Sequence, residues 1–522
     1  MKRLFRGATF VLSVTWLLGS ASAGPATTLS IGESLDKVGT IDLPSGMRIV
    51  IEEDHSKPVV ALVAVINAGA ADDPVGKEGL AHLVEHLTAR AKPDGRIQRS
   101  NLLDFAGAAS WNGATTHDVT TYGVVGPKEA LRNLLVIEGG RLAGPLAGLD
   151  AHVFEVERDN VKAELAERDE QGAPGAVQTK LYEALYPEGH RYHRPVLGTM
   201  KSVSELSVAD AQAFVEKYYV PNNVTLYVAG DLELSTIHQV FGATLPKQFI
   251  EAPASGPVRP PVRLSKEAPA VPLVPASQAV AAVQAPVAGP MLYISWSLPR
   301  GYSAEGTLER AVRSAIEAVP VWVNARSDIK EVRATLVAGR DSSTLVCAVA
   351  LKEGRNPEKS LEKVLDQFHR FSDPSTTKSG QEENSELGPS NMFARGFAPQ
   401  VGGQTKAVNT ASQSSGGVST GVGYVNPHMN DNGTTVLSPS VIGDYTLAVQ
   451  NNRSAEGTVP VRVSRYQMTA LVDDVVETES VLGRAVDRAT LAHWTGDSEA
   501  WGKDMTALTE VGPSTWQNFT LQ

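Results

Sequence analysis

The chain has 522 residues, more than one hydrophobic core usually serves, so two or three domains are expected. Its apolar fraction of 42% and charged fraction of 20% are those of an ordinary soluble globular protein. The net charge is −11 and basic residues form no concentrated patch, which argues against nucleic acid as a partner.

The first 23 residues read as a signal peptide. Lys2 and Arg3 give a positive start, a short apolar run follows over 8–19, and Ala21 and Ala23 offer the small residues that a signal peptidase needs. We therefore expect export into the periplasm or secretion from a bacterium, with no stable membrane span after cleavage. The alternative is an uncleaved membrane anchor.

Cysteine usage agrees with this compartment. Cys347 is the single cysteine, which excludes intramolecular disulfides and any zinc site with several cysteines. It stands in the apolar run "STLVCAVAL", so we expect a small core residue and not a nucleophile.

Residues 24–248 are predicted to form a first unit of α+β type. Strands grouped with amphipathic helices indicate a mixed or antiparallel sheet with helices on one face, an α/β sandwich. The expected strands are a hairpin over 40–54, a continuous apolar strand over 58–69, an alternating strand over 111–126 and a last strand over 222–232. The expected helices cover 77–92, 128–143, 151–170 and 208–220.

A Pro- and Ala-rich stretch over 249–290 reads as a semi-rigid linker to a second, similar unit over 291–522. The second unit repeats the order of strand, helix, two strands and helix in a coarse way. Its composition shifts to Ser, Gly, Asn and Thr over about 372–443, which predicts a long loop or a disordered insertion. Helices are expected again over 479–511.

The segment "GLAHLVEHL" carries the chemistry. On a helix, His82 and His86 project from one face, where two imidazoles can share one metal ion, and Glu85 can reach a water bound to it. A third ligand is needed, and the acidic helix offers Glu157 and Glu164, seven residues apart on one face. The alternative is a helix with two histidines by chance.

The sequence resembles the pitrilysin or insulinase-like zinc metallopeptidases, a family that includes the mitochondrial processing peptidases. The zinc-helix motif and the glutamate pair match, and "NGATTHDVTTYG", "HRYHRPVLGTMKSVSEL" and "YYVPNNVTLYVAGDL" resemble further family segments. Together the matches span roughly residues 40–245 in the expected order.

The resemblance implies that His82, His86 and Glu164 bind one zinc ion per chain. It implies that Glu85 is the general base and that Glu157 holds one ligand in place without touching the metal. Asn112 and the strand around Ala114 would present an edge to an extended peptide substrate; the alternative is that Asn112 only caps a turn. Three further histidines are expected at the surface: His117, His190 and His193.

Family members enclose peptides between two halves of a clamshell, each made of two such units. This chain would supply one half, and the other would come from a second copy or from a catalytically silent relative. Many relatives also carry an assisting Arg/Tyr pair, for which Arg300, Tyr302 and Arg326 are the candidates in this sequence. The expected function is a zinc endopeptidase acting on peptides or unfolded segments. The rival interpretations are a subunit with a binding or structural role, inactive without a partner half, and a zinc hydrolase of small substrates.

Overall fold

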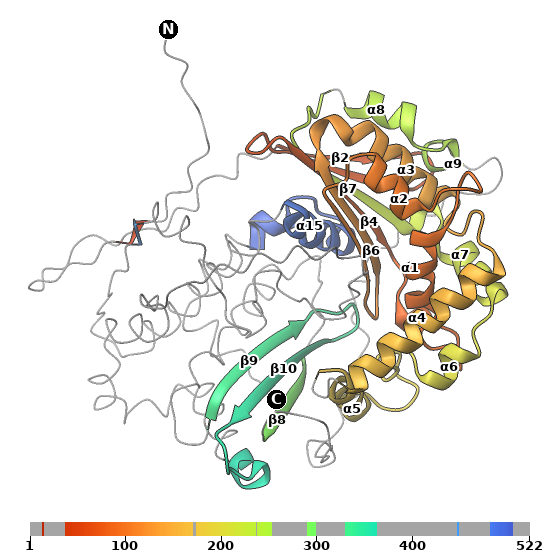
Figure 1. The fold of residues 1–522 in the computed structure, drawn as a ribbon. Helices are drawn as coiled ribbons and strands as arrows, with labels where there is room; N and C mark the ends of the chain where they lie inside the picture. The colour runs from red at the N-terminus through yellow and green to blue at the C-terminus, as the bar shows by residue number, and fades with distance from the viewer. Residues whose placement is uncertain are drawn as a thin grey trace, which may run out of the picture.

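The computed structural model describes residues 13–14, 37–170, 174–235, 237–252, 290–298, 329–362, 446–447 and 481–504. Its largest element is a six-stranded mixed sheet in the order β2-β3-β7-β4-β6-β5 (Figure 1). Strands β3 and β7 run parallel, and every other neighbouring pair in this sheet is antiparallel. The strands are β2 Lys37–Asp42, β3 Arg48–Glu53, β4 Val59–Ile66, β5 Ser110–Thr115, β6 Thr120–Pro127 and β7 Val224–Gly230.

The α-helices are α1 Leu80–Arg90, α2 Arg99–Phe105, α3 Leu131–Ala143, α4 Ala151–Glu170, α5 Pro174–Leu185, α6 Met200–Ser204, α7 Val208–Tyr218, α8 Ile237–Thr244, α9 Lys247–Ile250 and α15 Val481–Thr495. Short 3-10 helices are η1 Ala70–Asp72, η2 Lys128–Ala130 and η3 Pro221–Asn223. Two-residue strands β1 Ser13–Val14 and β11 Thr446–Leu447 pair with each other.

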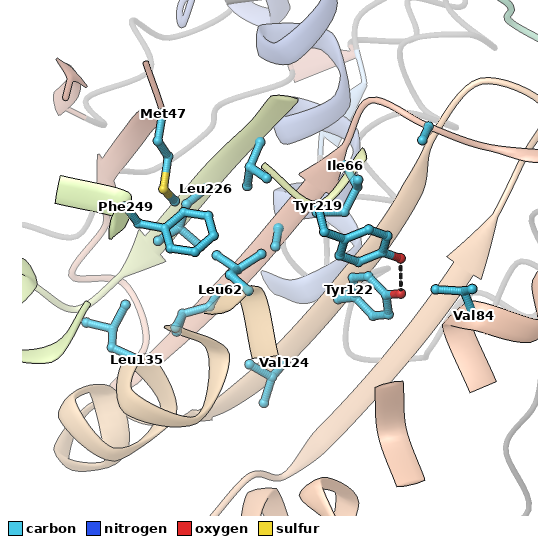
Figure 2. Packing of buried hydrophobic residues seen from close by; sticks show 14 of the residues in the cluster. Met47, Leu62, Ile66, Val84, Tyr122, Val124, Leu135, Tyr219, Leu226 and Phe249 are labelled. Carbon is cyan, nitrogen blue, oxygen red and sulfur yellow. Dashed lines mark hydrogen bonds between the residues drawn. The ribbon is translucent and has the colours of Figure 1, made fainter. Parts of the chain in front are cut away.

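The main core lies between one face of the sheet and the helices that cover it. Met47, Leu62 and Phe249 are fully buried there, and Figure 2 shows them beside Leu135 and Leu226. At the other side of the view, the hydroxyls of Tyr122 and Tyr219 form a hydrogen bond of 2.6 Å (Figure 2). The bond pairs two buried hydroxyl groups, as buried polar groups require.

Helix α15, from the far end of the chain, packs against the opposite face of the same sheet (Figure 1). Because side chains alternate along a strand, β4 presents Leu62 to the first core and Val63 to the second. Trp494 is 1% exposed in the second core. A buried ion pair between Arg488 Nη1 and Glu52 Oε1, at 2.6 Å, also joins α15 to β3.

A second sheet contains three antiparallel strands in the order β8-β10-β9: β8 Met291–Leu298, β9 Ile329–Val337 and β10 Ser343–Leu351. Its β9–β10 turn docks on the first unit. The Arg340 N–H donates to Asp118 Oδ2 at 2.7 Å, and Tyr186 and Thr344 share a hydroxyl hydrogen bond of 2.8 Å. Cys347 is buried in β10, which confirms the prediction of a core residue.

The predicted α/β sandwich with a mixed sheet and helices is confirmed, and the covering of its second face by α15 was not anticipated. The prediction of one strand over 111–126 is wrong, since the segment forms the hairpin β5–β6. The predicted surface position of His117 is also wrong: it is 8% exposed, and its Nε2 lies 3.0 Å from the Arg194 carbonyl oxygen.

Several predictions lie outside the described residues. They concern the signal peptide apart from residues 13–14, the linker over 253–289, the insertion over 372–443 and the Arg/Tyr candidates. Within the described residues, no helix combines the length and apolar character that a membrane crossing requires.

Candidate metal centre

Helix α1 carries the motif, and its start is fixed by Asp73. The Asp73 carboxylate accepts the backbone N–H groups of Gly79 and Ala81, both at 2.8 Å, which would otherwise lack partners at a helix N-terminus. Gly79 has φ of 91°, and a Cβ atom there would lie 2.5 Å from the Leu197 carbonyl oxygen. Only glycine fits this close approach at a left-handed position.

The helix is buried along most of its length. Every residue from Leu80 to Thr88 is buried, because α1 lies between the sheet and helices α4 and α7. A helix buried in this way is expected to carry apolar side chains, yet α1 also carries His82, Glu85 and His86. Buried polar side chains of this kind need partners or a metal ion.

Helix α4 supplies the partners. Phe154 and Val161 pack into the core. Glu157 and Glu164, each three residues later, lie close to the histidines of α1. Glu164 Oε2 lies 3.6 Å from His82 Nε2 and 3.8 Å from His86 Nε2. The structure therefore brings together the three residues that the sequence predicted as ligands.

The donor set fits a zinc ion. One ligand atom from each of His82, His86 and Glu164 lies within 4.8 Å of the other two. Tetrahedral zinc with bonds of about 2.1 Å holds its ligand atoms about 3.4 Å apart, close to the observed spacing. The buried Nε2 of His86 has no hydrogen-bond partner among the described residues. A metal ion would satisfy it.

Glu157 lies behind this set. Its Oε2 is 3.3 Å from His86 Nδ1, and its two oxygens accept Arg90 Nε at 3.0 Å and Asn160 Nδ2 at 3.2 Å. Burial alone would raise the pKa of Glu157, but the bonds from His86 and Asn160 and the charge of Arg90 lower it overall. An ionised Glu157 accepts the Nδ1 proton of His86 and leaves Nε2 for a metal.

Glu85 is buried between helix α1 and strand β5. It is 3% exposed, and its Oε2 accepts the Thr115 hydroxyl at 2.7 Å, which ties α1 to strand β5. Burial raises the pKa of Glu85 to about 7, partly offset by His86 and by the Thr115 bond. A carboxylate with such a pKa can both accept and return a proton near neutral pH.

Strand β5 forms an edge of the sheet beside Glu85. Among the described strands it pairs only with β6. Thr115 faces Glu85, so alternation places the side chains of Asn112 and Ala114 on the other face. Asn112 is exposed in mid-strand and does not cap a turn. Any contact of these two residues with a substrate beside Glu85 would therefore involve their backbone.

A pocket adjoins Glu85 and was not predicted from the sequence. Its wall includes Leu103 and Trp111, while Arg90, Arg141 and Glu157 provide charges. These residues come from α1, α2, α3, α4 and β5, elements that meet only in the folded chain. No local pattern in the sequence marks them as one surface.

Two family profiles match the chain. The profile described as "Insulinase (Peptidase family M16)" matches residues 48–200, and "Peptidase M16 inactive domain" matches residues 205–303. The first match contains every residue of the candidate metal centre.

Curated relatives include an uncharacterized zinc protease of Mycobacterium tuberculosis, 31% identical over 39% of this chain and 46% of that protein. The zinc protease PqqE of Helicobacter pylori is 23% identical over 44% of this chain and 52% of that protein. The chain thus spans about half the length of the curated relatives it matches.

Two solved structures share the fold. A protease from Helicobacter pylori has a TM-score of 0.63 at 14% identity, covering 93% of this chain and 96% of that one. The periplasmic protease PqqL from Escherichia coli has a TM-score of 0.56 at 14% identity, covering 92% of this chain and 46% of that one.

Proposed function

Because the chain belongs to the pitrilysin and insulinase-like family of peptidases, we propose that it is a zinc-dependent endopeptidase. One observation carries the proposal. Glu85 is buried beside the three potential metal ligands His82, His86 and Glu164, and its carboxylate contacts β5, which is an edge strand among the described strands. These ligands would hold one zinc ion, which when bound supplies a Lewis acid that polarises a carbonyl and lowers the pKa of a water.

The residues of the chain would then bind the peptide, transfer the proton and hold the metal ligands in place. An extended peptide adds to the edge of β5, where backbone pairing reads shape more than sequence. Glu85 takes a proton from the attacking water and passes it to the leaving amine, while Thr115 holds the carboxylate in place. Glu157 keeps His86 in one orientation. The pocket beside Glu85 would receive a side chain next to the bond that is cut.

The test is Glu85→Gln in the full chain, with zinc content and peptide cleavage both measured. Glutamine can still accept the Thr115 hydroxyl but cannot take the proton, so we expect turnover to fall by at least about 100-fold. Zinc content should stay unchanged because Glu85 is not a ligand. Glu216→Gln, an exposed position on α7, is the control and should leave both quantities unchanged. Loss of zinc in Glu85→Gln, or retained cleavage, would contradict the assignment.

A second candidate function is a subunit that is inactive without a partner half. The match to an inactive-domain profile and the half-length overlap with curated relatives favour it. Zinc binding without cleavage by the wild type would support it, and adding a second copy or a silent relative should then restore activity. Cleavage of small substrates but not of peptides would instead support a small-substrate hydrolase.

Export is part of the proposal. The solved relative PqqL is described as periplasmic, and the N-terminal sequence resembles a signal peptide. Mass measurement of the chain recovered from a bacterial periplasm should show a mature start near Gly24. An intact N-terminus there would argue for a retained anchor.

A further inference from the structure

A second set of potential metal ligands lies at the edge of the first sheet where β3 and β7 end. The two strands are parallel neighbours, so their carboxyl ends meet at the same edge. Glu53 is the last residue of β3 and His55 lies two residues beyond it, while Asp231 and Glu233 lie one and three residues beyond the end of β7. The Asp54 N–H donates to the Gly230 carbonyl oxygen at 2.9 Å and keeps the two segments together.

The ligand atoms of this set lie close enough together to share one metal ion. His55 Nε2 lies 3.3 Å from Glu53 Oε1 and 4.0 Å from Glu233 Oε1. One ligand atom from each residue lies within 4.8 Å of the other two, the same limit that the set His82, His86 and Glu164 meets. Small movements of the exposed Glu233 side chain would bring the three atoms to the separation of about 3.4 Å that tetrahedral zinc requires.

His55 is also oriented as a metal-binding histidine is. Its Nδ1 lies 2.6 Å from Asp231 Oδ1, and Asp231 Oδ2 accepts Lys128 Nζ at 2.7 Å. A carboxylate on Nδ1 fixes the tautomer that presents Nε2 to a metal. Glu157 makes the corresponding contact with His86 in the candidate metal centre. The arrangement is thus more than a group of acidic side chains.

We propose that Glu53, His55 and Glu233 form a second binding site for a divalent transition-metal ion such as zinc. The imidazole favours a transition metal over calcium or magnesium. The Glu53 side chain is 7% exposed, but those of His55 and Glu233 are 46% and 64% exposed, so water would complete the coordination. We expect weaker binding here than at the buried set. A bound ion would cross-link the ends of β3 and β7.

The inference does not rest on the proposed function, and zinc stoichiometry tests it directly. The metal-stripped full chain is titrated with Zn²⁺ against a chromophoric chelator. We expect two equivalents for the wild type, one for His55→Gln and one for the double variant His82→Gln, His86→Gln. His152→Gln, an exposed histidine at the start of α4, is the matched control and should still bind two. Asp231→Asn keeps all three ligands and should weaken the second site about 10- to 100-fold.

Two results would overturn the inference. One is a single bound zinc ion in the wild type that is lost in the double variant and kept in His55→Gln. His55 would then be only an ion-pair partner of Asp231 and Glu53. The other is two equivalents that both survive His55→Gln. If instead the double variant keeps two equivalents and His55→Gln loses one, the second site stands and the proposed catalytic site fails.

Discussion

Replacement of Glu157 by glutamine should weaken zinc binding while leaving the fold in place. Glu157 touches no proposed metal position but is close to three donors: His86 Nδ1, Arg90 Nε and Asn160 Nδ2. Glutamine has nearly the same shape and only one accepting oxygen. His86 would lose a charged acceptor, which normally makes its Nε2 a better ligand.

The expected magnitude follows from that contact. Loss of a carboxylate behind a ligating histidine costs about 10- to 100-fold in metal affinity, or about 1.4 to 2.7 kcal/mol. The effect on folding should be smaller, about 1 kcal/mol, because the Arg90 side chain is 26% exposed and water can replace its lost partner. Turnover per bound zinc should change little at saturating zinc.

A zinc titration in a buffered metal series, with peptide cleavage followed in parallel, measures both quantities. Glu155→Gln on the same helix is the matched control, because Glu155 is exposed and two residues away. If Glu157→Gln binds zinc within twofold of the wild type, or if Glu155→Gln weakens binding equally, then Glu157 does not hold His86 as we argue.

Two further predictions concern helix α15. Burial, with a smaller contribution from the charge of Arg48, lowers the pKa of His493 to about 4 from 6.5. Between these values the unfolded chain binds a proton that the folded chain excludes, so the free energy of unfolding should decrease as pH falls from 6.5 to 4, by about 3 kcal/mol. Urea unfolding over this pH range should show that decrease in the wild type but not in His493→Gln; equal slopes would refute it. Trp494→Ala should destabilise the chain by about 3 to 5 kcal/mol, because it empties a fully buried position in the second core. Phe105→Ala, at a side chain that is 77% exposed, should cost no more than about 0.5 kcal/mol, and equal losses in the two variants would contradict the packing.

Local periodicity accounts for the part of the site that could be predicted. The spacing of His82 and His86 fixes them on one helical face whatever surrounds the helix, and the same holds for Glu157 and Glu164. The packing of α1 against α4 is a tertiary contact that local periodicity does not determine. The sequence indicates it only through the family resemblance. The structure places Glu164 within 4 Å of both histidines.

The hairpin β5–β6 was missed for a local reason. Its turn carries none of the Gly, Pro or Asn-Gly signals that usually mark a reversal, but four polar residues over 115–118 interrupt the polar–apolar alternation there and include Asp118, a residue type common in turns. The turn is closed by Thr116 instead, whose hydroxyl accepts the N–H groups of Asp118 and Val119 at 3.2 and 3.1 Å. The polar run over 115–118, with Thr116 and Asp118 in it, is the local signal for this turn. The same turn buries His117, which sequence polarity had placed at the surface.

The second face of the first sheet is covered by a helix that lies beyond the boundary predicted at residue 248. Strand β4 was recognised as a continuous apolar run, and such a run requires cover on both faces. The helices between residues 77 and 250 cover one face, while α15 covers the other with Ala485, Ala489 and Trp494. A pattern of apolar residues shows that a helix needs a partner surface but does not say which. The sheet that supports Thr115 and Glu85 is therefore completed by a helix more than 200 residues further along the chain, so the candidate metal centre depends on both units.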